Sequence, residues 1–182
     1  MTSETAPHLR RERISDLHFR GSSIVTASQV VALAALAAVA GAEPAKGTIT
    51  FKSKSGTVVV DVKYAYLVKG PDVVSGKTIR RLVVSAADVG PALQKCGDMS
   101  CSDGGIGDGM TVDFDAGERV NYWFVARDQM IQHSGMADRS TVALTTDTPD
   151  RLAGRWDHDA SAGGGPVITV EFDAPLVKTL AK

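Results

Sequence analysis

Apolar residues recur at every second position through much of the chain after residue 43, which is the pattern of strands with one buried face. The longest example is VVVDVKYAYLV, in which charged residues alternate with apolar ones. It predicts one long strand whose apolar face is made by Val58, Val60, Val62, Tyr64 and Tyr66. The same alternation appears in MTVDFD, RVNYWFVA and VITVEF. Half-buried strands are therefore expected to form the core.

Shorter or less regular runs extend this pattern: TITFK, TIRRLVVS, MIQH, TVALTT and RLAGRWDH. Turn residues separate the runs at short intervals, as expected for an antiparallel meander. Only ADVGPALQK predicts a short helix, with Asp88 in position to cap its N-terminus. The predicted fold class is all-β: an antiparallel β-sandwich of about nine strands, with a closed β-barrel as the alternative. The irregular stretch 85–109 is expected to cross between two sheets.

The strand pattern also sorts side chains between core and solvent. The expected core consists of Val60, Val62, Tyr64, Val112, Phe114, Tyr122, Phe124, Leu144, Val170 and Phe172. Arg80 and Arg81 interrupt the alternation of TIRRLVVS. A bulge at this point would place both guanidinium groups on the solvent face, as a charged strand edge that discourages aggregation or as part of a polar binding surface.

Residues 1–42 are predicted to form a signal peptide. Four arginines, the last of them Arg20, precede an uncharged apolar run from Ser22 to Ala42. This order is typical of bacterial export signals, and the small residues Ala40 and Ala42 fit a cleavage site, so this segment is expected to be removed. A retained membrane anchor is the alternative, since the apolar run is close to the ~20 residues that span a bilayer. The expected location is periplasmic or secreted.

Residues 43–182 are predicted to form a single all-β domain. Cleavage leaves 140 residues, which suits one independent core. They carry 16 basic and 18 acidic side chains, a net charge of −2 that gives no electrostatic handle on nucleic acid or on an anionic membrane. No second apolar span follows the first, so no stable membrane span is expected after processing.

Cys96 and Cys101 are the only cysteines of the chain. Thiols in an oxidising compartment usually form disulfides, so a bond between the two is expected, pinning the Gly-rich segment that follows. A redox-active pair typically has two intervening residues at a helix N-terminus, whereas here four intervene and the pair follows the helical turn. A tetrahedral zinc site would need further Cys or His ligands nearby.

A second candidate site is MIQHSGM, in which Met130 and Met136 flank His133 at equal spacing. Two thioethers and an imidazole are a ligand set for copper, above all Cu(I). The cluster resembles, in residue type, the Met and His clusters of small exported copper-binding proteins of the copper-resistance type, which are also β-sandwiches. Residues three apart on a regular strand point to opposite faces, so a shared site requires the strand to end before His133.

The stretch Trp156-Asp157-His158-Asp159 is a third candidate, with an imidazole between two carboxylates beside a Gly-rich hairpin. Asp157 and Asp159 would share one strand face, with His158 on the other. Solvated hairpin residues are the favoured interpretation, because no nucleophile motif such as G-x-S-x-G accompanies them.

These observations predict an exported binding or interaction module without catalytic activity of its own. Its partner would be an envelope protein or a small ligand, and no nucleic acid. A periplasmic copper-binding protein that uses Met130, His133 and Met136 is the first alternative, with copper as its cofactor. A small-ligand-binding barrel or an enzyme is the second. An apolar cavity would favour a ligand carrier, whereas a filled core would favour the interaction module.

Overall fold

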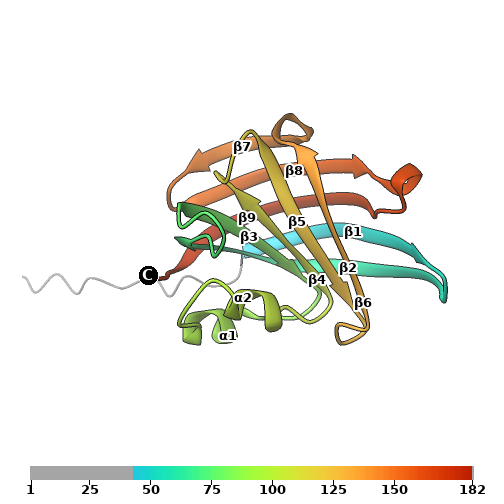
Figure 1. The fold of residues 1–182 in the computed structure, drawn as a ribbon, viewed down its shortest axis with the longest axis horizontal. Helices are drawn as coiled ribbons and strands as arrows, with labels where there is room; N and C mark the ends of the chain where they lie inside the picture. The colour runs from blue at the N-terminus through green and yellow to red at the C-terminus, as the bar shows by residue number, and fades with distance from the viewer. Residues whose placement is uncertain (1–42, 182) are drawn as a thin grey trace, which may run out of the picture. The chain divides into compact units, whose positions relative to one another are not determined.

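The computed structural model describes residues 43–181, which form a curved β-sheet with two short helices on its outer side (Figure 1). The predicted signal peptide, residues 1–42, lies outside the described residues, as does the last residue of the chain. No helix of residues 43–181 has the length and apolar character that crossing a bilayer requires.

All nine runs identified in the sequence form strands. They are β1 (Glu43–Ser53), β2 (Gly56–Pro71), β3 (Thr78–Ser85), β4 (Gly109–Phe114), β5 (Arg119–Ala126), β6 (Ile131–Asp138), β7 (Val142–Thr148), β8 (Arg151–Asp159) and β9 (Val167–Thr179). The helical elements are α1 (Gly90–Lys95), α2 (Cys101–Gly104) and the 3-10 turns η1 (Arg139–Thr141) and η2 (Ser161–Gly163). The predicted all-β antiparallel class is confirmed.

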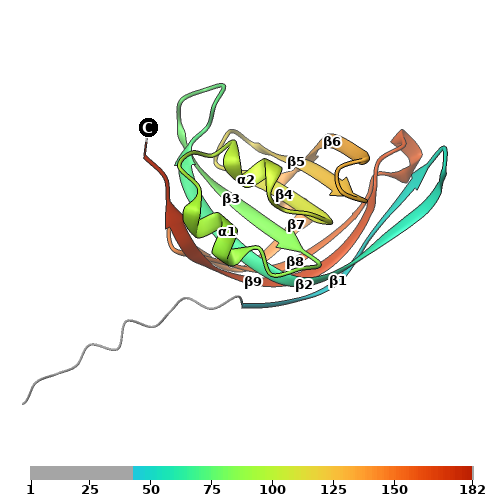
Figure 2. The same ribbon diagram turned by 90° about the horizontal axis from the view of Figure 1, so that it is seen from below.

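The strands pair in the order β6-β5-β4-β3-β2-β1-β9-β8-β7, and each of these neighbouring pairs is antiparallel. A short parallel pairing between β2 and the end of β9 is added to this meander. The single sheet curls into a half-barrel, an arrangement between the predicted sandwich and the closed barrel (Figure 2). The expectation of a crossover at 85–109 is wrong, because this segment joins β3 and β4, which are neighbours in the sheet.

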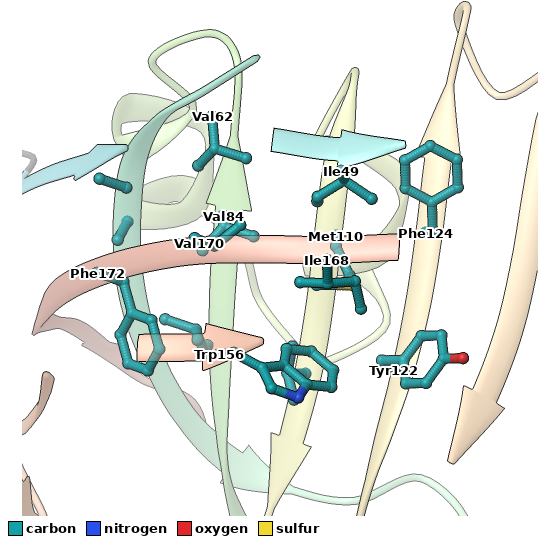
Figure 3. Packing of buried hydrophobic residues seen from close by; sticks show 14 of the residues in the cluster. Ile49, Val62, Val84, Met110, Tyr122, Phe124, Trp156, Ile168, Val170 and Phe172 are labelled. Atoms are coloured by element: carbon teal, nitrogen blue, oxygen red, sulfur yellow. The ribbon is translucent and has the colours of Figure 1, made fainter. Parts of the chain in front are cut away.

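The concave inner face of the half-barrel holds the main apolar core. One arm of the sheet is formed by β3–β6, and the other by β1 and β7–β9. Side chains from the two arms meet in the interior, where Tyr122 of β5 faces Trp156 of β8 (Figure 3). Phe124 of β5 likewise faces Phe51 of β1. Alternation in each strand supplies these inward residues, so the core follows directly from the period of two.

A second apolar cluster lies on the outer face, beneath α1 and α2. Tyr66, Val83 and Leu93 belong to it, and Tyr64 packs against it. The expectation that both tyrosines share a face with Val62 is wrong. The inward-facing positions of β2 shift by one residue between Val62 and Ala65, beside an irregular pairing of β1 with β2. Such irregularities re-aim the side chains that follow them.

Most of the predicted core is buried. Val60, Val62, Val112, Phe114, Tyr122, Phe124, Val170 and Phe172 are each at most 4% exposed. Tyr64 and Leu144 are only half-buried. Leu144 lies where the pairing of β7 with β8 shifts register, opposite Gly154. A Cβ on Gly154 would lie 2.3 Å from the carbonyl oxygen of Ala143, so glycine permits the close approach of these two strands.

The two adjacent arginines of β3 point to opposite faces. The interpretation of a bulge at a solvent-exposed edge is wrong, since β3 is an internal strand that pairs regularly with both neighbours. Arg80 points to the inner side at one end of the half-barrel, in line with Leu82 of the core. Arg81 points outward and is buried, at 7% exposure. Regular pleating therefore places the two guanidinium groups on opposite faces of the sheet.

Candidate functional site

The interior of the half-barrel contains a cluster of rings that sequence reasoning did not assemble. This aromatic–imidazole cluster consists of Phe51, Tyr122, His133, Trp156 and His158. The Trp156 and His158 rings stack with centroids 5.8 Å apart, and the Tyr122 ring lies 6.1 Å from that of His133. Such separations are typical of favourable ring contacts. The cluster joins β1, β5, β6 and β8 across the opening of the half-barrel.

The two imidazoles of the aromatic–imidazole cluster are surrounded mainly by other rings. The imidazole rings of His133 and His158 make no side-chain hydrogen bond within residues 43–181, and the Asp159 carboxylate interacts electrostatically with His158. Burial raises the pKa of the Tyr122 phenol, which keeps it neutral. The Trp156 indole donates a hydrogen bond to the Thr141 hydroxyl, 3.1 Å away. These contacts are those of a packed interior.

The structure separates the three residues of the predicted copper site. β6 is continuous from Ile131 to Asp138 and pairs with β5 without a register shift, so the strand does not end before His133. His133 faces the interior beside Phe51, whereas Met136 is 58% exposed and lines the outer side of the sheet. Met130 lies in the preceding turn and is 84% exposed. A common site would require β6 to unpair; copper binding stays a prediction for titration with Cu(I).

The stretch at the end of β8 divides between the two faces as its alternation predicts. Asp157 lies outside, where the Arg155 guanidinium donates hydrogen bonds to it, one of 2.9 Å. Asp159 accepts a hydrogen bond from the amide of Ser161. His158 stacks inside on Trp156 and is half-buried, which corrects the interpretation of a solvated hairpin residue. No group of three or more His, Cys, Asp or Glu side chains within residues 43–181 is arranged to hold a metal ion.

The sulfur atoms of Cys96 and Cys101 lie at disulfide distance, 2.13 Å apart, in the segment between β3 and β4. The buried Arg81 fastens the same segment to the sheet. Its guanidinium donates to the Met99 carbonyl at 2.9 Å, the Ser102 hydroxyl at 2.9 Å and the Asp103 carboxylate at 2.7 Å. The cysteine pair closes a small loop within this segment, and the contacts of Arg81 hold α2 against the outer face.

Arg81 also orients a carboxylate of β4. Both oxygens of Asp113 accept hydrogen bonds from it, at 2.5 and 2.9 Å, in the bidentate geometry that suits a guanidinium. The pKa of Asp103 is raised by burial, which outweighs the nearby charge of Arg81. All three guanidinium nitrogens are engaged, so Arg81 and its two carboxylates form a closed network on the outer face.

An open groove of about 570 Å³ lies beside this network, over β4, β5 and β6. We call it the outer groove. Its lining is Arg81, Asp103, Thr111, Asp113, Asn121, Tyr122, Trp123, Ser134, Gly135 and Met136. The outward positions of three adjacent strands supply most of these residues. Trp123 is half-buried and packs on the second apolar cluster, so its ring is supported from below.

Gly135, which borders the outer groove, leaves room on the inner face for the ring of a core residue. Tyr122 and Gly135 are cross-strand partners, and a Cβ on Gly135 would lie 2.4 Å from the Tyr122 hydroxyl oxygen. The ring therefore lies over the glycine at the edge strand, an arrangement in which an aromatic side chain covers the gap left by a missing one. The Tyr122 hydroxyl makes no hydrogen bond within residues 43–181.

A second groove of about 640 Å³ lies on the outer face of the other arm. Its lining includes Lys46, Arg155 and Glu171, which are joined by salt bridges of 2.7 and 3.0 Å. The remaining residues are mostly small, and the single ring, Phe172, is 4% exposed. The two grooves are similar in size but differ in chemistry: aromatic and polar in the outer groove, small and ion-paired in the second.

No protein-family model, no curated protein and no solved structure matches this chain.

Sequence reasoning missed the outer groove because its residues come from separate strands. One local signal was present: Asn121 and Trp123 occupy the outward positions of RVNYWFVA, and a tryptophan on the polar side of an alternating strand is unusual. The register that places Trp123 opposite Thr111 and Ser134 could not be read from sequence. Without it, Met136 was associated with His133, three residues away, instead of with its neighbours across the sheet.

Proposed function

We propose that the chain is an exported binding module that holds its partner in the outer groove and carries no catalytic chemistry of its own. The observation that supports this most directly is the lining of the outer groove. It combines the supported ring of Trp123 and the exposed thioether of Met136 with polar groups held in fixed positions by Arg81. Sites with a few fixed polar groups among apolar side chains are typical of ligand recognition.

The filled interior argues against a ligand carrier. The inward positions of both arms are occupied by apolar and aromatic side chains, so a ligand inside the half-barrel would have to displace the aromatic–imidazole cluster. A bound molecule meets no such obstacle in the outer groove, which is open to solvent. The interaction module is therefore favoured over the ligand-binding barrel.

Export is the part of this proposal that rests on residues 1–42. Protein recovered from the envelope without reductant is expected to begin at Glu43 and to have no free thiol, because Cys96 and Cys101 lie at disulfide distance. Intact-mass analysis before and after alkylation measures both. A full-length chain in the membrane fraction would support the retained anchor instead, and two free thiols would remove the disulfide.

The binding proposal is tested by placing a photo-crosslinking amino acid at Met136 in cells. The matched control carries the same group at Thr145, which is exposed in the second groove. We expect one defined adduct from position 136 and none from position 145. The adduct should disappear when Asn121→Arg fills the outer groove, while the thermal melting curve stays unchanged. Equal labelling from the two positions would contradict the proposal.

A further inference from the structure

We propose that the outer groove binds a saccharide chain that is uncharged or carries amino groups. This inference rests on the proposed function, since it names the ligand class of the same groove. Its support comes from three properties of the lining: a fixed aromatic ring, a set of fixed planar polar groups, and the lack of a guanidinium or ammonium group that could receive an anion.

The aromatic ring is Trp123. It stands on the central strand of the groove, with Asn121 two residues away on the same face. Its contact with the second apolar cluster below leaves little freedom to reorient, so binding would not have to order it. The apolar face of a sugar ring packs against such an indole, while the hydroxyl groups at its rim stay directed at polar neighbours.

The polar groups suit hydroxyl ligands. Each sugar hydroxyl can donate one hydrogen bond and accept others, so a matching site needs both acceptors and donors. Asp113 and Asp103 supply carboxylate oxygens, and the side chains of Asn121 and Ser134 can do either. Arg81 fixes Asp113 through both oxygens, which holds the acceptor in place before a ligand arrives.

The charge of the groove selects against anions. Arg81 is the only cationic side chain in its lining, it is 7% exposed, and all three of its nitrogens already donate to protein oxygens. Two carboxylates face this one guanidinium, so the lining carries an excess of one negative charge. A phosphate, sulfate or uronic acid would find no free donor of positive charge and would be repelled, whereas neutral and amino sugars would not.

The shape of the groove favours a chain over a single sugar. The groove runs over three strands, is open to solvent, and has a volume within the range of small-molecule sites. An extended basic peptide would be attracted by the same excess of negative charge. It is the less favoured occupant, because both carboxylates are already neutralised in part by Arg81 and the other polar residues are uncharged.

The test is a titration of the processed, 15N-labelled protein followed by NMR. The probes are chitotriose, its deacetylated form, maltotriose, a trigalacturonate and a tetralysine peptide. The chain has two tryptophans, so the indole signal of Trp156, buried in the interior, serves as an internal control for that of Trp123. We expect an uncharged or amino trisaccharide to shift the Trp123 indole and Asn121 amide signals at concentrations up to about 10 mM, and the trigalacturonate to shift neither.

Two exposed-site variants complete the design. Asn121→Ala is expected to weaken saccharide binding by about fivefold or more, since it removes a hydrogen-bonding side chain from the rim. Thr145→Ala in the second groove is expected to change nothing. The inference fails if no uncharged or amino saccharide shifts Trp123, if the shifts map to the second groove, or if only the peptide binds. A crosslink at Met136 without any saccharide shift would sustain the proposed function and eliminate this ligand class.

Discussion

The two arms of the half-barrel are fastened at opposite ends by different chemistry. At one end lies the aromatic–imidazole cluster around Tyr122 and Trp156. At the other lies an ionic cluster of Arg80, Asp115, Arg139 and Asp147. Arg80 bonds Asp115 at 2.5 and 2.9 Å and Asp147 at 2.7 Å, and Arg139 bonds the same two carboxylates at 3.2 and 2.7 Å. These contacts link β3 and the β4–β5 turn to η1 and β7.

The difference between the two ends lies in how much water they exclude. Trp156 is 2% exposed and Tyr122 4%, whereas the side chains of Asp115 and Asp147 are 34% and 42% exposed. Burial of large rings stabilises a fold by removing apolar area from water. Partly solvated ion pairs contribute less to stability, and their contribution depends on the charge state of both partners. The aromatic end should therefore dominate stability, and the ionic end should dominate its dependence on acid.

The largest effect is expected from Trp156→Ala. The change leaves a cavity where the arms meet and removes the indole donor to Thr141, so the free energy of unfolding should fall by about 3 to 5 kcal/mol. Trp156→Phe should lower the free energy of unfolding clearly less, because it retains a ring. Urea denaturation followed by far-UV circular dichroism measures both. A loss below that of the Arg80 variant described next would reverse the ranking of the two ends.

Arg80→Met should have the second-largest effect. The Arg80 side chain is 12% exposed and also donates to the Thr148 carbonyl at 2.8 Å, so the substitution leaves three acceptors without this donor. A loss of roughly 2 kcal/mol is expected. Arg155→Met is the matched control: its ion pairs lie on the exposed outer face, and no measurable loss is expected. Equal losses in the two variants would show that the ionic cluster is an ordinary surface feature.

An acid titration should separate the two ends. Hydrogen bonds from Arg80 lower the pKa of Asp115 and that of Asp147 below the usual value near 3.8. A lowered pKa in the folded state stabilises the fold above the pKa of the unfolded chain, and this contribution is lost as the pH falls through the folded value. The ionic end should therefore weaken below about pH 4.

The difference between wild type and Arg80→Met isolates this effect from that of the other carboxylates. It should shrink as the pH falls from 5 towards 2.5, roughly the range over which these carboxylates become protonated. Trp156→Phe should show a constant difference over the same range. Urea midpoints measured at successive pH values provide the comparison. A gap for Arg80→Met that does not change with pH would mean that its carboxylate contacts contribute nothing.

The sequence predicted the strands well because alternation is a local property. All nine runs, and the helix of ADVGPALQK, appear where the pattern indicated. The predicted sheet face of Tyr64 and Tyr66 was wrong because the irregular pairing of β1 with β2 is set by the partner strand. It leaves no trace in VVVDVKYAYLV. The curl of the sheet, which brings Trp156 to Tyr122, depends on long-range twist in the same way.

The candidate site was less accessible for the same reason. His158 was assigned correctly to the face opposite Asp157, yet its surroundings come from β5, which only the three-dimensional fold brings close. Arg81 was treated as an edge charge because nothing local reveals that α2 returns to cover it. Residue types and strand faces can thus be read from sequence, whereas cross-strand register and the packing of segments over the sheet cannot.

The smallest effect is expected in alkali, and it belongs to the aromatic end. Burial raises the pKa of the Tyr122 phenol above its usual value of 10. A group whose pKa is raised in the folded state contributes its stability below the pKa of the unfolded chain and loses it as the pH rises through the folded value. Wild type should therefore lose stability above about pH 10, and Tyr122→Phe should lose less.

A second buried phenol, that of Tyr66, should respond to alkali in the same direction. Its pKa is also raised by burial and by its hydrogen bond to Asp88, beneath α1 on the outer face. Tyr66→Phe is therefore the control that separates the two faces, and the double variant should be the least sensitive to alkali. Stability measured in urea between pH 8 and 11, roughly the range over which a phenol ionises, is expected to fall most steeply for wild type. If Tyr122→Phe falls as steeply as wild type, the Tyr122 phenol is solvated, and the aromatic end is more open at Gly135 than its packing indicates.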